Sequence, residues 1–370
     1  MEQNQNNLTT TVKLSIIIVN YQSWEHVDRL VDSLSASPSI LSGHAEILVV
    51  DNHSRQPIPS SVSKASRAVR LLLRSENGGF SAGVNTGWRE STGRWLLVLN
   101  PDVSTDSGLV ERVLGRILRF EDSSVSAPGV VGFGLRNIDG THQPSVGSFP
   151  TLARTIREQF LPRSRRKYQP DRKHRPGQVD WVTGACMLLN CRLMDDVGGM
   201  DEDFFLYYEE VALCRSASRR GWRIEYDPEV SVAHLDPLQN RPISPKMRAV
   251  TRHSKLLYFR KHLPTWHYSV LVAAVRLEAR FRYFLSKAQG RTVEARSWRL
   301  IGKMASRLAA GQRIVGREVR IMAESVDDPP EEPEPVDFRS GLFRESRLNQ
   351  PITQGSRRTR PFRPKKDGAR

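Results

Sequence analysis

Short apolar runs alternate with polar segments over the first hundred residues of the chain. Residues 14–19, 46–50, 69–73 and 95–99 are dominated by Val, Ile and Leu with little polar alternation, which is typical of strands buried on both faces. Between the first two runs, residues 24–36 space their apolar side chains as a helix does. Polar residues follow each run. This order predicts an α/β fold with a parallel sheet.

The run at 95–99 ends abruptly at Asn100-Pro101-Asp102. Proline removes a donor from the strand ladder and restricts the residue before it, so Asp102 is expected just past the carboxyl end of a central strand. Open α/β sheets bind ligands at that edge, and a carboxylate there suits a divalent cation that also contacts phosphate oxygens. The alternative is a simple turn in which Asp102 caps the next helix.

Two further segments end in residues suited to a nucleotide. Asp51 follows the second strand and could accept a hydrogen bond from a base or ribose, or could cap a helix. Glycines 78, 79 and 83 have two interpretations. They either let the backbone approach a phosphate closely at the start of a helix, or they form a plain glycine-rich turn.

An aromatic run at 204–208 leads into a helix that starts with Glu209 and Glu210 and is closed by Gly221. Neighbouring, partly desolvated carboxylates raise each other's pKa, as a general base needs, although both are also ordinary residues for a helix N-terminus. Two short strands, 222–226 and 230–233, lead to His234, which is either a core histidine or a ligand.

The remaining segments are basic. Residues 154–175 predict a mobile loop, and residues 247–262, 266–287 and 298–320 predict basic helices. Such helices either lie in an anionic membrane interface or pack on the catalytic domain with a solvated basic face. Residues 1–13 and 325–370 contain too few apolar residues to pack and are expected to be disordered.

Composition narrows the class of protein. The 370 residues include 56 Lys and Arg against 40 Asp and Glu, a net charge of +16 that fits nucleic acid, an anionic membrane or phosphorylated substrates. Three cysteines without a CxxC pair argue for a reducing compartment and against a disulfide framework or zinc site. The polar N-terminus and the lack of an apolar run of about 20 residues predict a cytosolic protein.

Taken in order, these segments resemble a family 2 glycosyltransferase with the GT-A fold, and more narrowly the bacterial rhamnosyltransferase-like group. The resemblance covers about residues 14 to 262. The matching pieces are Ile16–Tyr21, Val49–Asn52, Asn77–Asn85, Leu99–Asp102, Gly184–Met187, Gly198–Asp201, Phe204–Cys214, Gly221-Trp222 and Val232–His234.

The resemblance implies roles for individual residues. Nucleotide-sugar contacts would come from Asn20, Tyr21, Asp51, Asn77, Gly83, Asn85 and Asn100, and acceptor contacts from Trp181, Gly184, Ala185 and Tyr208. Asp102 and His234 would bind Mg²⁺ or Mn²⁺. Glu210 would be the catalytic base, with Glu209 as the second candidate.

The chain departs from the family pattern at two positions. Glu210 stands where the family has aspartate, and Ala212 where an acidic residue is usual, which puts the base assignment in question.

The implied reaction is inverting transfer of a sugar, rhamnose among the candidates, from a nucleotide diphosphate to a saccharide or polyprenyl-diphosphate-linked acceptor. The implied location is peripheral, on the anionic inner face of the cell membrane, with no nucleic acid as partner.

The resemblance also implies a division of the chain into a catalytic domain at 14–245, with a nucleotide-binding half at 14–105 and an acceptor half at 176–240, and a basic helical region at 246–324.

Two rival functions remain. A nucleotidyltransferase would need a basic, glycine-rich loop after the first strand, and Asn20-Tyr21-Gln22-Ser23 is not one. A catalytically impaired protein that binds sugar nucleotides or nucleic acid is the second rival.

Overall fold

A computed structural model describes residues 12–63, 69–124, 126–158, 175–236 and 243–327. One ten-stranded sheet organises most of these residues, with its main path in the order β3-β2-β1-β4-β11-β6-β12-β5. Its strands are β1 (Leu14–Asn20), β2 (Ala45–Asp51), β3 (Val69–Leu73), β4 (Trp95–Leu99), β5 (Val103–Ser104), β6 (Val130–Arg136), β7 (His142–Gln143), β9 (Gly177–Gln178), β11 (Cys186–Asn190) and β12 (Ile224–His234). A two-stranded sheet pairs β8 (Val146–Gly147) with β10 (Trp181–Val182).

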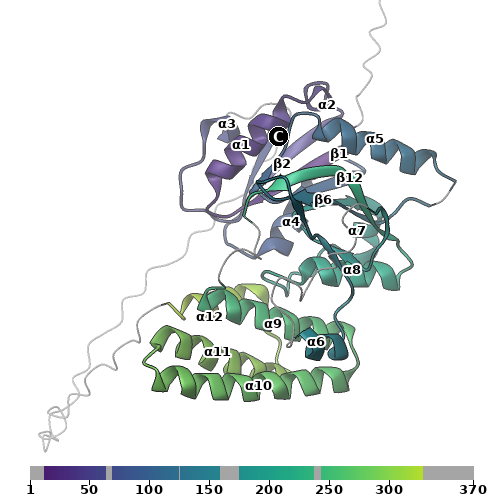
Figure 1. The fold of residues 1–370 in the computed structure, drawn as a ribbon. Helices are drawn as coiled ribbons and strands as arrows, with labels where there is room; N and C mark the ends of the chain where they lie inside the picture. Colours follow the sequence, from purple (N-terminus) through teal and green to yellow (C-terminus); the bar gives the residue numbers. More distant parts are fainter. Residues whose placement is uncertain (1–11, 64–68, 125, 159–174, 237–242, 328–370) are drawn as a thin grey trace, which may run out of the picture. The chain divides into compact units, whose positions relative to one another are not determined.

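The first four long strands form the predicted parallel half of the sheet. β1 pairs with β2 and with β4, and β2 pairs with β3, all in parallel. β1, β2 and β4 are buried along their whole length, as their continuous apolar runs require. Figure 1 shows the helices around this sheet, which confirms the predicted α/β class. These helices are α1 (Trp24–Ser35), α2 (Pro38–Leu41), α3 (Ser60–Ser63), α4 (Phe80–Glu90), α5 (Leu109–Asp122), α7 (Cys191–Val197) and α8 (Glu209–Arg219).

The second half of the sheet is mixed, which the strand pattern alone does not predict. β11 lies antiparallel between β4 and β6. The two short strands expected at 222–226 and 230–233 are one strand, β12, which runs parallel to β6 with a shift in register between Asp227 and Ser231. The Asp-Pro-Glu segment looks like a chain break in sequence, but the structure accommodates it as a bulge.

Helices α9 (Pro245–His262), α10 (Thr265–Ala288), α11 (Thr292–Ala309) and α12 (Gly316–Glu324) form the C-terminal part of the described chain. The helix expected over 298–320 is therefore two helices, separated at Gly311, whose φ of +78° favours glycine. In the described residues no helix is both long and apolar enough to cross a membrane.

Some sequence expectations fall largely outside the described residues. Residues 1–11 and 328–370, within the segments expected to be disordered, lie there, and so do residues 159–174 of the segment expected to be a mobile loop. The described start of that segment belongs to a short helix, α6 (Leu152–Glu158).

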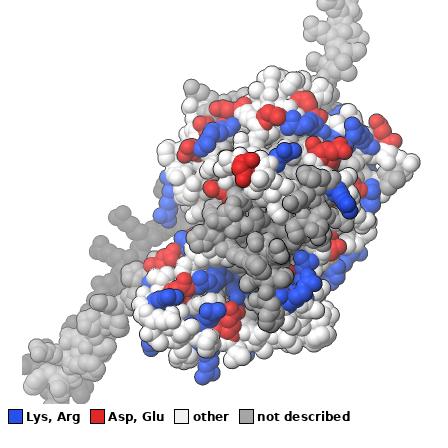
Figure 2. Space-filling view, in the orientation of Figure 1, with Lys and Arg blue, Asp and Glu red and all other residues white. Residues whose placement is uncertain are grey.

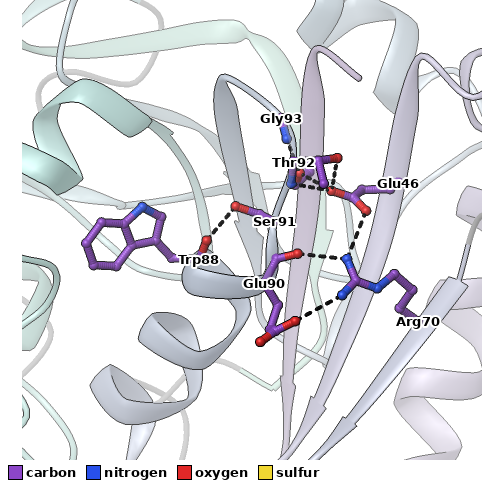
Figure 3. A network of polar contacts seen from close by, with 8 residues as sticks. Glu46, Arg70, Trp88, Glu90, Ser91, Thr92 and Gly93 are labelled. Carbon is purple, nitrogen blue, oxygen red and sulfur yellow. Dashed lines mark hydrogen bonds and ion pairs between the residues drawn. The ribbon is translucent and has the colours of Figure 1, made fainter. Parts of the chain in front are cut away.

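A polar network around the buried side chain of Glu46 fixes the turn between α4 and β4 (Figure 3). One Glu46 oxygen accepts hydrogen bonds from Ser15 Oγ at 2.7 Å and from the Thr92 amide at 2.7 Å and hydroxyl at 2.8 Å. Its other oxygen lies 3.5 Å from Arg70, which also bonds to Glu90. Because Glu46 lies near the start of β2, this network is at the amino end of the parallel strands.

We predict that Glu46→Ala lowers the free energy of unfolding by about 1–3 kcal/mol, because it leaves the buried Ser15 hydroxyl and the Thr92 amide without their acceptor. Urea denaturation measures the change. Glu25→Ala is the control, because Glu25 is an exposed helix residue in a surface ion pair with Arg29. Equal stability of the two variants would show that the Glu46 network contributes nothing beyond a surface ion pair.

His253 on α9 is 1% exposed, and this burial lowers its pKa to about 4 from the ordinary 6.5, against the opposing influence of the Asp203 carboxylate. Between pH 6.5 and 4 the unfolded chain therefore binds a proton that the folded chain does not. Stability is unaffected above this window and falls as the pH falls through it.

We predict that His253→Leu reduces the loss of unfolding free energy between pH 7 and pH 5 by about 2 kcal/mol. Urea denaturation at the two pH values measures this difference, with His44→Gln at an exposed histidine as the control. If wild type and His253→Leu lose equal stability, burial of His253 does not make the fold sensitive to acid.

Candidate active site

The carboxyl ends of the parallel strands gather most of the predicted site residues at one edge of the sheet. Asn20 ends β1 opposite Asp51 at the end of β2. Asn100 follows β4, and its amide donates to the carbonyl of Ala185 at 3.0 Å, just before the antiparallel β11 begins. His234 ends β12, which is parallel to β6. Residues from both halves of the chain therefore meet at this edge.

At the carboxyl ends of β1 and β2, the polar side chains form hydrogen bonds with one another. Asn20 Nδ2 donates to Asp51 Oδ1 at 3.0 Å and to Ser54 Oγ at 3.1 Å, and Asp51 Oδ2 accepts from the Ser54 amide at 3.0 Å. Asn20 and Asp51 are buried, whereas Tyr21 is 44% exposed. Asp51 thus closes the turn after β2, but it does not cap a helix as the alternative expected, because the next described helix, α3, begins only at Ser60. Ligand contacts by all three side chains stay predictions.

The glycine cluster brings the start of α4 against the segment that precedes α8. Gly79 has a φ of +93°, and a Cβ there would lie 2.2 Å from the Phe205 carbonyl oxygen. The Phe80 amide donates to that same oxygen at 3.0 Å. Asn77 Oδ1 accepts from the Gly79 amide at 3.0 Å, and Asn52 Nδ2 donates to the Gly79 carbonyl at 2.8 Å. The cluster therefore joins the two halves of the chain.

Gly83 and Asn85 on α4 make contacts that hold the fold. A Cβ at Gly83 would lie 2.5 Å from Val19 Cγ1, so glycine lets α4 pack directly on β1. Asn85 Oδ1 accepts from the Met200 amide, and its Nδ2 donates to the Met200 carbonyl, each at 2.8 Å. Their predicted place beside the nucleotide stays untested.

The predicted metal residues, Asp102 and His234, lie together. His234 Nε2 is 3.4 Å from Asp102 Oδ1, and the Leu235 amide donates to the Asp102 carbonyl at 2.9 Å, which fastens the loop to the end of β12. Both side chains are partly accessible, at 10% and 18% of their surface. The other ring nitrogen, Nδ1, is 2.8 Å from the Gln143 amide. No third His, Cys, Asp or Glu joins them within the described part of the chain.

This pair fits a divalent cation that takes its remaining ligands from a diphosphate. A carboxylate suits Mg²⁺ and Mn²⁺, and an imidazole is a ligand of transition metals, so the mixed pair favours Mn²⁺. Gln143 was not singled out from the sequence. In the structure, Gln143 Nε2 donates to Nδ1, which leaves the ring proton on Nε2 facing Asp102, so binding of a cation there requires the Gln143 amide to be turned until its Oε1 accepts from Nδ1–H.

Glu209 and Glu210 begin α8 and are buried, at 5% and 6% exposure. The two residues before them, Tyr207 and Tyr208, have φ of +69° and +70°, a left-handed conformation that is costly for residues other than glycine. The Ala212 amide donates to the Tyr208 carbonyl at 2.8 Å. The backbone therefore turns sharply to deliver the two carboxylates.

The C-terminal helices hold this segment through Asp203, which the sequence analysis did not identify. Asp203 Oδ1 accepts from Arg313 Nε at 3.0 Å and Nη2 at 2.8 Å, and its Oδ2 accepts from Lys261 Nζ at 2.6 Å. Burial alone would raise the pKa of Asp203, but these hydrogen bonds hold it below its ordinary value. In addition, Ser254 Oγ donates to the Leu206 carbonyl at 2.8 Å. No local sequence pattern marks these pairings, because they join residues 48 to 110 positions apart.

The predicted acceptor residues differ in accessibility. Trp181 is 1% exposed, and its indole Nε1 donates to the Ser148 carbonyl at 3.0 Å, so it lies in the core. Ala185 is also buried, whereas Gly184 and Tyr208 are partly exposed. Gly184 lies against the Phe80 ring, which a Cβ there would approach to 3.3 Å. An acceptor contact by any of them stays a prediction.

Comparison with known proteins identifies the family of the chain. Residues 15–198 match the family model "Glycosyl transferase family 2". The N-acetylglucosaminyl-diphospho-decaprenol L-rhamnosyltransferase of Mycobacterium tuberculosis is 29% identical over 244 residues, which are 60% of this chain and 75% of that protein. The low-salt glycan biosynthesis hexosyltransferase Agl10 of Haloferax volcanii is 30% identical over 235 residues, covering 61% and 68%.

Among solved structures, the mannosyltransferase PcManGT of Pyrobaculum calidifontis, in complex with GDP-Man and Mn²⁺, aligns at a TM-score of 0.46 with 14% identity. That alignment covers 85% of this chain and 88% of PcManGT. The order of motifs, the α/β fold and the relatives lead to one conclusion: this chain is a glycosyltransferase of family 2, similar to rhamnosyltransferases and with the GT-A fold.

Proposed function

We propose that this protein catalyses the inverting, metal-dependent transfer of a sugar, rhamnose being the leading candidate, from a nucleotide diphosphate to a saccharide acceptor of a cell-wall or surface polysaccharide. The observation that carries the proposal is the proximity of His234 Nε2 and Asp102 Oδ1, 3.4 Å apart, at the sheet edge where Asn20 and Asp51 also end their strands. Ligands of open α/β sheets bind at this edge.

On this proposal, the first half of the chain binds the donor. Asp51 and Asn20 would contact the base and ribose beside the exposed ring of Tyr21, and the loop from Asn77 to Gly79 would border the sugar nucleotide. Asp102 and His234 would hold a divalent cation, which when bound neutralises the negative charge that develops on the departing diphosphate. Gln143 would orient His234 toward it.

Glu210 would take the proton from the acceptor hydroxyl as that oxygen attacks the anomeric carbon from the face opposite the diphosphate. The configuration at that carbon is then inverted, and the proton rests on the carboxylate. The place of Glu210 supports this role, because it begins α8 directly after the sharply turned Tyr207-Tyr208 segment and is shielded from water. Glu209 is the second candidate for the base.

We further propose a polyprenyl-diphosphate-linked acceptor and a peripheral position on the cytoplasmic face of an anionic membrane. The relative from Mycobacterium tuberculosis carries the name of an enzyme acting on N-acetylglucosaminyl-diphospho-decaprenol. The basic character of helices α9 to α11 supports contact with anionic lipid.

Donor binding is tested by the thermal stability of the protein with UDP, dTDP, GDP or ADP, each with and without Mn²⁺. We expect one nucleotide to stabilise the wild type only with metal, by about 2.7 kcal/mol at a hundred times its Kd. Asp102→Asn should lose the metal-dependent part of this stabilisation, because it removes the charged ligand.

Asp106→Asn is the matched control, since this exposed carboxylate forms an ion pair with Arg112 at 2.9 Å. It should respond to nucleotide and Mn²⁺ as the wild type does. A metal-dependent shift that persists in Asp102→Asn would refute the metal assignment. If no nucleotide stabilises the wild type, the donor site itself is wrong.

For the base, we predict that Glu210→Gln lowers kcat about a hundredfold or more while leaving the Kd for the donor within about twofold. The amide keeps the size of the side chain but cannot accept the proton. Turnover is followed as nucleotide release in the presence of a lipid-linked saccharide, and donor affinity by calorimetry.

Glu209→Gln serves as the comparison for Glu210→Gln, since the two side chains are adjacent and equally buried. Wild-type turnover by Glu210→Gln together with inactivity of Glu209→Gln would move the base to Glu209. Donor binding without transfer by the wild type would favour the sugar-nucleotide-binding rival, in which Glu210 and Ala212 mark a lost activity.

A further inference from the structure

Helix α10 is apolar on two opposite faces. Its inner face, which includes Leu271, Val275 and Ala279, is buried, and the helix packs against α11 and α9. Its outer face carries five large apolar side chains that remain between 46% and 72% exposed, and we call them the outer stripe: Trp266, Val270, Leu277, Phe281 and Phe284. A surface helix normally turns polar residues outward, so a second apolar face indicates a further contact.

The outer stripe is continuous along the helix. Its members are separated by four, seven, four and three positions, which places them within a sector of about 60° and over a length of about 27 Å. The exposed Ala273 and Ala274 fill the gap between Val270 and Leu277. In Figure 1, α10 runs along the outer edge of the group of C-terminal helices.

Positive charge borders the outer stripe. Arg276, Arg280 and Lys287 are exposed and lie on one side of the stripe, within about 80° of its edge. The one acidic residue in the sequence of α10, Glu278, is half-buried and paired with Arg252 of α9 at 2.8 Å. Elsewhere, on the face that Figure 2 shows, basic and acidic side chains are interspersed.

We infer that the outer stripe of α10 is the surface by which this protein lies on an anionic membrane. The aromatic and aliphatic side chains would enter the boundary between headgroups and acyl chains, while the neighbouring guanidinium and ammonium groups contact lipid phosphates. A second copy of the chain fits less well, because two such stripes face to face would bring their bordering positive charges together. The inference rests on the membrane part of the proposed function and names the surface responsible.

The test is co-sedimentation of the full chain with vesicles of phosphatidylcholine, with or without phosphatidylglycerol. We expect binding to the anionic vesicles that weakens as salt is added, because exposed charges are screened. The double variant Leu277→Glu/Phe281→Glu should lower the affinity roughly a hundredfold, since two large apolar groups no longer enter the interface. Arg276→Gln and Arg280→Gln should each lower it about fivefold, and only for anionic vesicles.

The matched control is Leu41→Glu/Ile138→Glu, which places the same charges at two apolar side chains that are 76% exposed elsewhere. It should bind vesicles as the wild type does. Thermal unfolding and nucleotide binding confirm that each variant is folded. Unchanged vesicle binding by the stripe variant, or no binding by the wild type, overturns the inference.

Sedimentation velocity tests whether the outer stripe instead mediates self-association. A wild-type dimer that the stripe variant converts to a monomer, with no vesicle binding by either, would assign the outer stripe to self-association and overturn the membrane assignment. Nucleotide binding is measured on the same samples, so failure of the donor site and failure of the membrane surface are distinguished. Vesicle binding without any nucleotide response would leave this inference standing and refute the transferase proposal.

Discussion

The in-register parallel pairing of β1 with β2 and with β4 is the constraint on which the rest of the structure depends. Because Asn20 stands opposite Asp51 and β4 ends beside them, the polar residues that end three buried strands must meet at one edge. The register decides this meeting, because a slip of one residue would turn every side chain of a strand, the polar residues at its end included, to the other face. β11 enters antiparallel beside β4 and brings the segment around Gly184 to the same edge.

Long-range polar contacts hold the second half of the chain in place. The buried Asp203 carboxylate binds Lys261 of α9 and Arg313, which lies between α11 and α12, so the C-terminal helices fix the segment that leads to Glu209 and Glu210. From the other side, Gly79 of the first half approaches Phe205 too closely for any side chain. The two left-handed tyrosines directly follow these anchored residues, which explains how a strained turn is kept before the two carboxylates.

The C-terminal helices α9 to α12 therefore make two kinds of contact, one with the rest of the fold and one, through α10, with the surroundings of the protein. Their inner face supports the segment that carries the carboxylates, and the outer stripe of α10 faces away from its packed side. If the outer stripe lies on a membrane, the same group of helices links the lipid surface to the proposed acceptor side of the site. The charge bordering the stripe and the buried charge at Asp203 thus serve separate purposes, one with lipid phosphates and one within the fold.

The sequence by itself determined the strands of the parallel half, the position of Asp102 at a strand end and the helix that Glu209 and Glu210 begin, because these depend on local apolar periodicity and on proline. It did not determine that β11 is antiparallel, that β12 is one bulged strand, or that Gly311 divides the last helices. It also gave no sign of Gln143 beside His234, or of the ion pairs at Asp203. Those features arise from pairings between residues far apart in the chain, which leave no local pattern, and only the tertiary structure brings them together.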